Sequence, residues 1–155
     1  MSGKTFRLGI AAGLAGGAAE VAWVALYGAV TGTPVGIVAR GVTVAVFPGL
    51  IPLAHAALIG IALHMLLAIG LGIAVVAAFR TPWLRQVAPW PQTLLVVLAL
   101  GAVWACNFLV VLPQLDPGFL TLLPMAVTLA SKLLFGVSAA AVLRVGPVGA
   151  AVSAP

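Results

Sequence analysis

Four long apolar stretches constrain this chain more than any other feature of its sequence. They lie at about residues 8–30, 53–79, 93–112 and 120–143. Each is long enough to cross the hydrocarbon core of a bilayer as an α-helix, which takes about 20 residues. The segments between them are rich in Pro and Gly, as in FPGLIP and LPQLDPG, and therefore read as breaks. The pattern predicts an all-α membrane protein in which four spans form a helical bundle.

The composition supports lipid as the solvent for most of the surface. Of the 155 residues, 64% are hydrophobic and only 6% are charged, whereas soluble domains are roughly 25% charged. Seven basic and two acidic side chains are too few to cover a soluble fold of this size. We therefore expect a single transmembrane domain over residues 1–144, followed by a flexible Gly- and Pro-rich tail over 145–155.

The N-terminal sequence has two interpretations. MSGKTFRLGIAAGLAGGAA has the basic start and small-residue end of a signal peptide. However, the apolar run continues through VAWVALYGAV, past any plausible cleavage site. We therefore predict an uncleaved first span.

The connection over residues 31–52 is too long for a tight turn and too apolar for an ordinary loop. Thr33 as a possible N-cap and Pro34 at the first helical position predict a helix over residues 33–47. With about 15 residues this helix is too short to span a bilayer comfortably. We expect a short interfacial or re-entrant helix between spans 1 and 2, with a fifth span as the alternative.

The basic residues predict the orientation in the membrane. With a cytoplasmic N-terminus, one basic residue, Arg40, lies outside, and five lie on the cytoplasmic side: Lys4, Arg7, Arg80, Arg85 and Arg144. Because cytoplasmic segments carry an excess of Lys and Arg, both termini are predicted to be cytoplasmic. This placement accounts for most of the basic residues, and we do not expect nucleic acid as a partner.

Four polar side chains interrupt the spans, one in each: Glu20, His64, Asn107 and Lys132. At about 1.5 Å per helical residue, all four lie ~17–22 Å from the inner ends of their helices, in one layer near the middle of the membrane. An unpaired charge at this depth costs at least about 2.5–3.5 kcal/mol. We therefore predict an ion pair between Glu20 and Lys132, with hydrogen bonds from His64 or Asn107. Without such a pair, Glu20 would have to be protonated.

The role of this polar layer is open to two interpretations. The Glu20–Lys132 pair can fix the register of two helices, or it can act as a working proton or ion site. His64 can be an interior histidine satisfied by its surroundings, or it can relay protons or bind a ligand. For Asn107, an interhelical hydrogen bond is the expected role.

Small residues share the helix faces that carry the polar groups. We predict helix-packing stripes that contain Gly9, Gly13, Gly16, Gly17, Gly60, Gly72 and Gly136. The first four lie on one face with Glu20, and Gly60 and Gly72 lie at multiples of four residues from His64. Such stripes allow the backbone of another helix to approach closely. The partner helix can belong to the same chain, to a homo-oligomer or to a larger membrane complex.

The sequence lacks recognised patterns for a cofactor, metal or catalytic centre. His55 and His64 lie nine residues apart on one helix, about 180° around its axis, so they cannot clasp one haem within a chain. Only a homodimer would supply His64 twice. Cys106 is the single cysteine, and its apolar surroundings predict a buried thiol. Walker and Ser-His-acid patterns are missing as well. We therefore predict no metal, no cofactor, no catalytic residues and no enzymatic activity.

Short motifs in all four spans resemble a known family. They are GIAAGLAGG in the first span, HMLLAIGLGIAVVAAF in the second, NFLVVLPQL at the end of the third and SKLLFG in the fourth. In these the chain resembles small four-helix bacterial inner-membrane proteins of the YagU type, a family of uncharacterised function. The resemblance covers His64 to Arg144, and the N-terminal half in outline. It implies four spans and a bacterial inner membrane, and it implies no activity.

Two functions fit these observations. The first is an accessory or structural subunit that packs within a homo-oligomer or a larger membrane complex. The second is a small proton-coupled transporter or channel-like protein in which Glu20, His64 and Lys132 line a path. Because four spans with short loops form a thin wall, the second function requires an oligomer.

Overall fold

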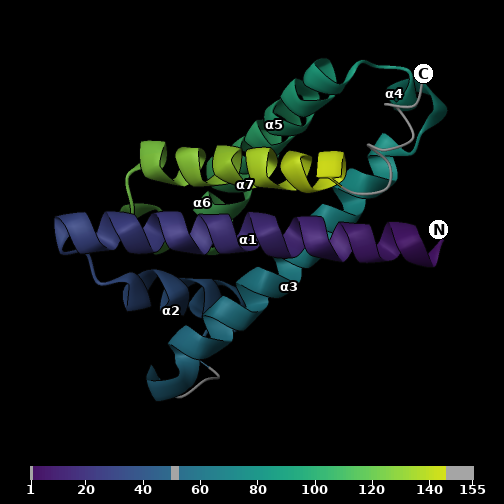
Figure 1. Ribbon diagram of the computed structural model, residues 1–155. Helices are drawn as coiled ribbons and strands as arrows, with labels where there is room; N and C mark the ends of the chain where they lie inside the picture. Colours follow the sequence, from purple (N-terminus) through teal and green to yellow (C-terminus); the bar gives the residue numbers. More distant parts are fainter. Residues whose placement is uncertain (1, 50–52, 146–155) are drawn as a thin grey trace.

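The protein is described by a computed structural model that covers residues 2–49 and 53–145 (Figure 1). The described part consists mostly of helices and contains no β-strand. Four helical segments are long and apolar enough to cross a membrane: α1 (Gly3–Thr31), α3 (Leu53–Phe79), α5 (Pro89–Cys106) with its continuation to Leu115, and α7 (Met125–Val145). The prediction of an all-α protein with four spans is confirmed. The predicted C-terminal tail lies outside the described residues, apart from its first residue.

Shorter helical elements connect these spans. The 12-residue helix α2 (Val35–Val46) follows α1, and the single turn α4 (Pro82–Arg85) follows α3. A π-helical turn η1 (Asn107–Val111), the short α6 (Leu112–Leu115) and the 3-10 turn η2 (Pro117–Thr121) follow α5. A helix therefore lies where the sequence predicts a short one between spans 1 and 2.

The third and fourth spans begin or end at other residues than those predicted from the sequence. Helix α5 begins at Pro89 rather than near residue 93. Backbone N–H groups in the first turn of a helix have no partner within the helix, so a proline, which has no N–H, is tolerated there. The helical path then continues through LPQL, which we expected to be a break. Pro113 cannot donate to a carbonyl of the preceding turn, and the widened π turn at Asn107–Val111 lies directly before it.

Helix α7 begins at Met125, later than residue 120, because the preceding segment forms a separate 3-10 turn. The Asp116 side chain caps that turn by accepting a hydrogen bond from the backbone N–H of Phe119, at 3.3 Å. The helical path therefore stops and restarts between the third and fourth spans.

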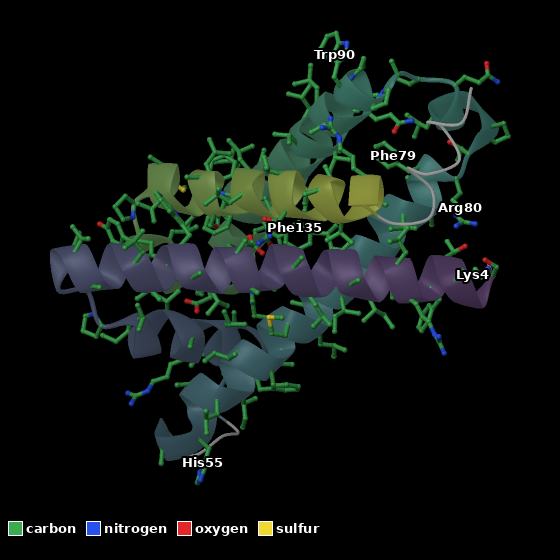
Figure 2. All side chains as sticks on the ribbon, in the orientation of Figure 1. Lys4, His55, Phe79, Arg80, Trp90 and Phe135 are labelled. Carbon is green, nitrogen blue, oxygen red and sulfur yellow. The ribbon has the colours of Figure 1, made fainter. Side chains whose placement is uncertain are left out.

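The main helix contacts run in the order α2, α3, α1, α7, α5 (Figure 1). Helices α1 and α7 lie side by side and antiparallel, and α3 crosses α1 obliquely on its other side (Figure 1). The start of α1, the end of α3 and the end of α7 lie toward one end of the molecule. Lys4 and Arg80 lie at that end, whereas His55 lies at the opposite one (Figure 2).

Glycines allow α1 and α3 to approach closely. A Cβ atom on Gly13 would lie 2.5 Å from Ala68 O and from Ile69 Cα, and one on Gly72 would lie 2.5 Å from Gly13 Cα. Real Cβ atoms essentially never approach other heavy atoms this closely. The two backbones can therefore approach this closely only because glycine lies at the contact, on α1 opposite Ala68 and Ile69 and on both helices where Gly13 meets Gly72.

The other predicted stripe residues also pack within the chain. Gly9 contacts Ile73 of α3, and Gly17 contacts Met65 and Ala68 of the same helix. The remaining three face other helices: Gly16 lies against Phe135 of α7, Gly60 against Ala39 of α2 and Gly136 against Val97 of α5. The stripes are therefore occupied by contacts inside a single copy of the protein.

The hydrophobic core lies on the side of the molecule that carries the start of α1. It is formed by Ala12, Ala68, Val75, Val76, Val96, Leu100, Phe135 and Ala139, which come from all four spans. Phe135 is fully buried and lies between α1 and α7 (Figure 2). Helix α5 packs mainly against α7, so few of its residues are covered. Cys106 of α5 is exposed, and the prediction of a buried thiol was wrong for this reason.

Candidate functional site

Glu20 of α1 forms the centre of a cluster contributed by three helices. The residue is only 4% exposed, and its two carboxylate oxygens face different partners. Oε1 lies 2.7 Å from Nζ of Lys132 on α7, and Oε2 lies 3.6 Å from Nε2 of His64 on α3. Because α1 lies between α3 and α7, one side chain of α1 reaches both neighbouring helices.

The position of Lys132 is fixed by an aromatic ring as well as by the carboxylate. Its Nζ lies 5.3 Å from the ring centroid of Phe135, within the range of a cation–π interaction. The ring packs against Gly16 of α1, where any side chain would collide with it. Because Gly16 has no side chain, the Phe135 ring can pack against α1 and interact with the ammonium group of Lys132.

Two polar atoms of the cluster are buried without a hydrogen-bond partner in the described structure. They are Oε2 of Glu20 and Nε2 of His64. Their separation of 3.6 Å exceeds a good hydrogen bond, although the two atoms belong to the same cluster. A buried polar atom without a partner costs about 1–3 kcal/mol. The polar atoms of the cluster are therefore not all hydrogen-bonded, as they would be if the cluster served only to fix the register of the helices.

A cavity of about 860 Å³ adjoins the cluster. Its wall is mostly aliphatic and aromatic, and it is built by α1, α2, α3 and α7 together with the segment from α5 to η2. Among the described residues that line it, three are titratable: Glu20, His64 and Lys132. Ligand sites in proteins typically have ~300–1,000 Å³, an apolar wall and a few polar groups. Size and lining both fit a site for a small amphipathic molecule.

The cavity exists because α3 and α5 share the core over only part of their lengths. Val75 and Val76 of α3 belong to one buried cluster with Val96 of α5. Nearer the start of α3 and nearer the end of α5, Ile61 and Val103 line the cavity instead. Helix α2 is attached to α3 there, through a 2.5 Å hydrogen bond that Thr43 Oγ1 donates to Ala56 O.

The structure brings together three of the four residues of the predicted polar layer. Asn107, the fourth, is exposed and lines the same cavity from the start of η1. Within the described part of the chain, it makes no side-chain hydrogen bond to Glu20, His64 or Lys132. The hydrogen bond expected from Asn107 to the ion pair is therefore not formed in this structure.

Phe135 and the two tryptophans near the site were not singled out from the sequence. Phe135 lies three residues after Lys132, a spacing that places two side chains on one helix face, so the sequence did contain this signal. Thr128, one turn before Lys132, accepts a 3.0 Å hydrogen bond from Nε1 of Trp104 on α5. Trp23 of α1 similarly donates to the backbone carbonyl of Val127, at 3.0 Å. Tryptophans thus tie α7 to both of its neighbours near the cluster.

Comparison of the chain with known protein families, with curated proteins and with solved structures gives no match. The resemblance to the YagU type therefore stays a prediction. Among the residues that the structure describes, no group of three or more His, Cys, Asp or Glu side chains is placed to hold a metal ion. The candidate site consists of the cluster around Glu20 and the adjoining cavity.

Proposed function

We propose that this protein is a small proton-coupled transporter or channel-like membrane protein, with Glu20, His64 and Lys132 as its central site. One observation carries the proposal: three titratable side chains from three helices meet beside a large apolar cavity. Ionisable residues inside membrane spans are costly, and where they face a cavity they typically mark a path for protons, ions or substrates. A site of this kind can accept or release a proton when its partners change.

The alternative, an accessory subunit, has less support from the geometry. It relies on glycine stripes that receive a partner, yet Gly13, Gly16 and Gly72 already contact helices of the same chain. It also treats the ion pair as a lock for helix register. A lock requires neither an adjoining cavity nor two unpartnered buried atoms.

We further propose a bacterial inner-membrane location with cytoplasmic N- and C-termini. The excess of basic residues on one side supports this orientation. We also expect a homo-oligomer, because four spans provide little wall around a path. Crosslinking in native membranes and protease protection of terminal tags would test these two expectations.

The proposed function is tested by proton flux in proteoliposomes that contain a pH-sensitive dye. Under an imposed membrane potential, we expect vesicles with the wild-type protein to acidify faster than protein-free vesicles. The double variant Glu20→Gln/Lys132→Met removes both charges of the pair and should acidify at the protein-free rate.

The chain offers a matched control for this experiment. Lys4 is the only other lysine and Asp116 the only other acid, and neither lines the cavity. Lys4→Met/Asp116→Asn therefore makes the same change in charge away from the site and should leave the flux at the wild-type rate. A folded Glu20→Gln/Lys132→Met protein with wild-type flux would contradict the proposed function.

A further inference from the structure

We propose that the cavity binds an amphipathic carboxylate, whose head group takes the position of the Glu20 carboxylate between Lys132 and His64. Its apolar chain would lie along the wall formed by α2, α3 and the segment from α5 to η2. This inference rests on the proposed function, because it names the class of molecule that the same site would take.

The first support is the accessibility of the side chains of His64 and Lys132. The side chains of His64 and Lys132 are 28% and 19% exposed, whereas that of Glu20 is 6% exposed. The side chains of His64 and Lys132 are therefore more accessible from the cavity than the Glu20 carboxylate, although Nε2 of His64 is itself buried. The site offers an ammonium group and an imidazole, which are the donors that a carboxylate requires.

The second support is the geometry of Glu20 itself. Its carboxylate already lies between the two nitrogens, with one oxygen toward Lys132 and the other toward His64. A single carboxylate group in this position therefore faces both nitrogens. The contact to Lys132 is short at 2.7 Å, but the contact to His64 is long at 3.6 Å, so the resident carboxylate satisfies only one of them.

The third support is the conservation of charge in the apolar site. If a carboxylate from a ligand replaces that of Glu20, the site gains a negative charge unless Glu20 or His64 takes up one proton. Among the described residues of the cavity wall, only His64 and Lys132 are also titratable. Uptake of one proton by the site with each carboxylate keeps the net charge unchanged. Anion and proton would therefore bind together.

A cationic ligand fits the same site less well. It would have to displace Lys132 from Glu20, which leaves an ammonium group in apolar surroundings without a partner. It would also approach the carboxylate past two basic side chains. The volume of about 860 Å³ and the apolar wall, which includes Phe119 and Leu123, suit the chain of a medium-length carboxylate.

Photolabelling with two matched probes tests the inference. The probes are a medium-chain carboxylate and a trimethylammonium compound of the same chain length, each with a diazirine at the chain end. In lipid nanodiscs, the carboxylate probe should label Phe119, Leu123 or their neighbours in the wall, and excess dodecanoate should suppress this labelling. Lipid-facing Leu58 and Leu98 report non-specific labelling, which excess dodecanoate should not suppress.

Variants of Glu20 and Lys132 should change labelling by the carboxylate probe in opposite directions. Glu20→Gln removes the competing carboxylate, so labelling per folded protein should reach half-saturation at a lower concentration of the carboxylate probe. Lys132→Met should lose the suppressible labelling. If Lys132→Met does not fold, Glu20→Gln/Lys132→Met, which lacks both charges, must still show this loss.

Three results would overturn the inference. They are suppressible labelling of the wall by the trimethylammonium probe alone, loss of carboxylate labelling in folded Glu20→Gln, and the lack of suppressible labelling by either probe. In each case, proton flux that depends on the Glu20–Lys132 pair would leave the proposed function standing. Conversely, suppressible carboxylate labelling supports the binding site, and it contradicts the proposed transport if no flux that depends on the Glu20–Lys132 pair is seen either under a membrane potential or under an inward gradient of dodecanoate.

Discussion

Replacing Lys132 alone with methionine should destabilise the folded protein by about 3–5 kcal/mol, because Glu20 would lose the partner of its buried charge. Glu20→Gln alone should also be destabilising, since the ammonium group of Lys132 would keep only the ring of Phe135. The double variant Glu20→Gln/Lys132→Met should recover most of the loss, because neither charge remains. Unfolding by sodium dodecyl sulfate in mixed micelles, followed by circular dichroism, measures these differences.

The control for this series is the charge-matched pair Lys4→Met and Asp116→Asn, which lies outside the cluster. Each of these changes should alter stability by no more than about 0.5 kcal/mol, because Lys4 is exposed and the amide oxygen of asparagine at position 116 can still accept the capping hydrogen bond from Phe119. A double variant as unstable as the worse single variant would show that Glu20 and Lys132 are not coupled. That result would contradict the ion pair.

Gly72→Ala should be destabilising, whereas Gly70→Ala on the same helix should be neutral or stabilising. A Cβ atom on Gly72 would collide with backbone atoms of Gly9 and Gly13, and α1 and α3 would have to move apart. Overpacking of this kind costs about 1–3 kcal/mol, and backbone atoms cannot rotate away as a side chain can. Gly70 has no heavy atom within 4 Å of such a Cβ, and alanine is the better helix former by about 1 kcal/mol.

The same unfolding titration compares the two glycine variants. Because both replace glycine by alanine within α3, the difference between them isolates the contact with α1 from helix propensity. Equal stability of the two variants would mean that α1 and α3 do not approach as closely as Gly13 and Gly72 indicate.

The four spans could be predicted from the sequence because their signals are local. The length of an apolar run decides whether it can span a bilayer, and Pro- and Gly-rich segments separate the runs. The end of the third span could not be predicted in this way. Pro113 was read as part of a break, but the π turn before it lets the helical path continue to Leu115, and that turn is not visible in the pattern of apolar residues.

The candidate site was only partly accessible from the sequence. Depth along each helix placed Glu20, His64 and Lys132 in one layer, and the structure has these three side chains in one cluster. Depth does not determine direction around a helix axis, however, and Asn107 therefore lies at the cavity without joining the cluster. The cavity depends on where α3 and α5 cease to share the core, which is a property of the packed helices and not of any single segment.

The contact of Glu20 on α1 with Lys132 on α7 is the central claim, and solid-state NMR in lipid bilayers tests it most directly. Glu20 is the only glutamate in the chain, so carboxyl-¹³C glutamate labels one site. Side-chain ¹⁵N lysine labels Lys4 and Lys132, and Lys4→Arg leaves Lys132 alone. We predict a strong ¹³C–¹⁵N dipolar coupling, as required by the 2.7 Å contact between Lys132 Nζ and Glu20 Oε1. The absence of this coupling in folded protein would contradict the site described above.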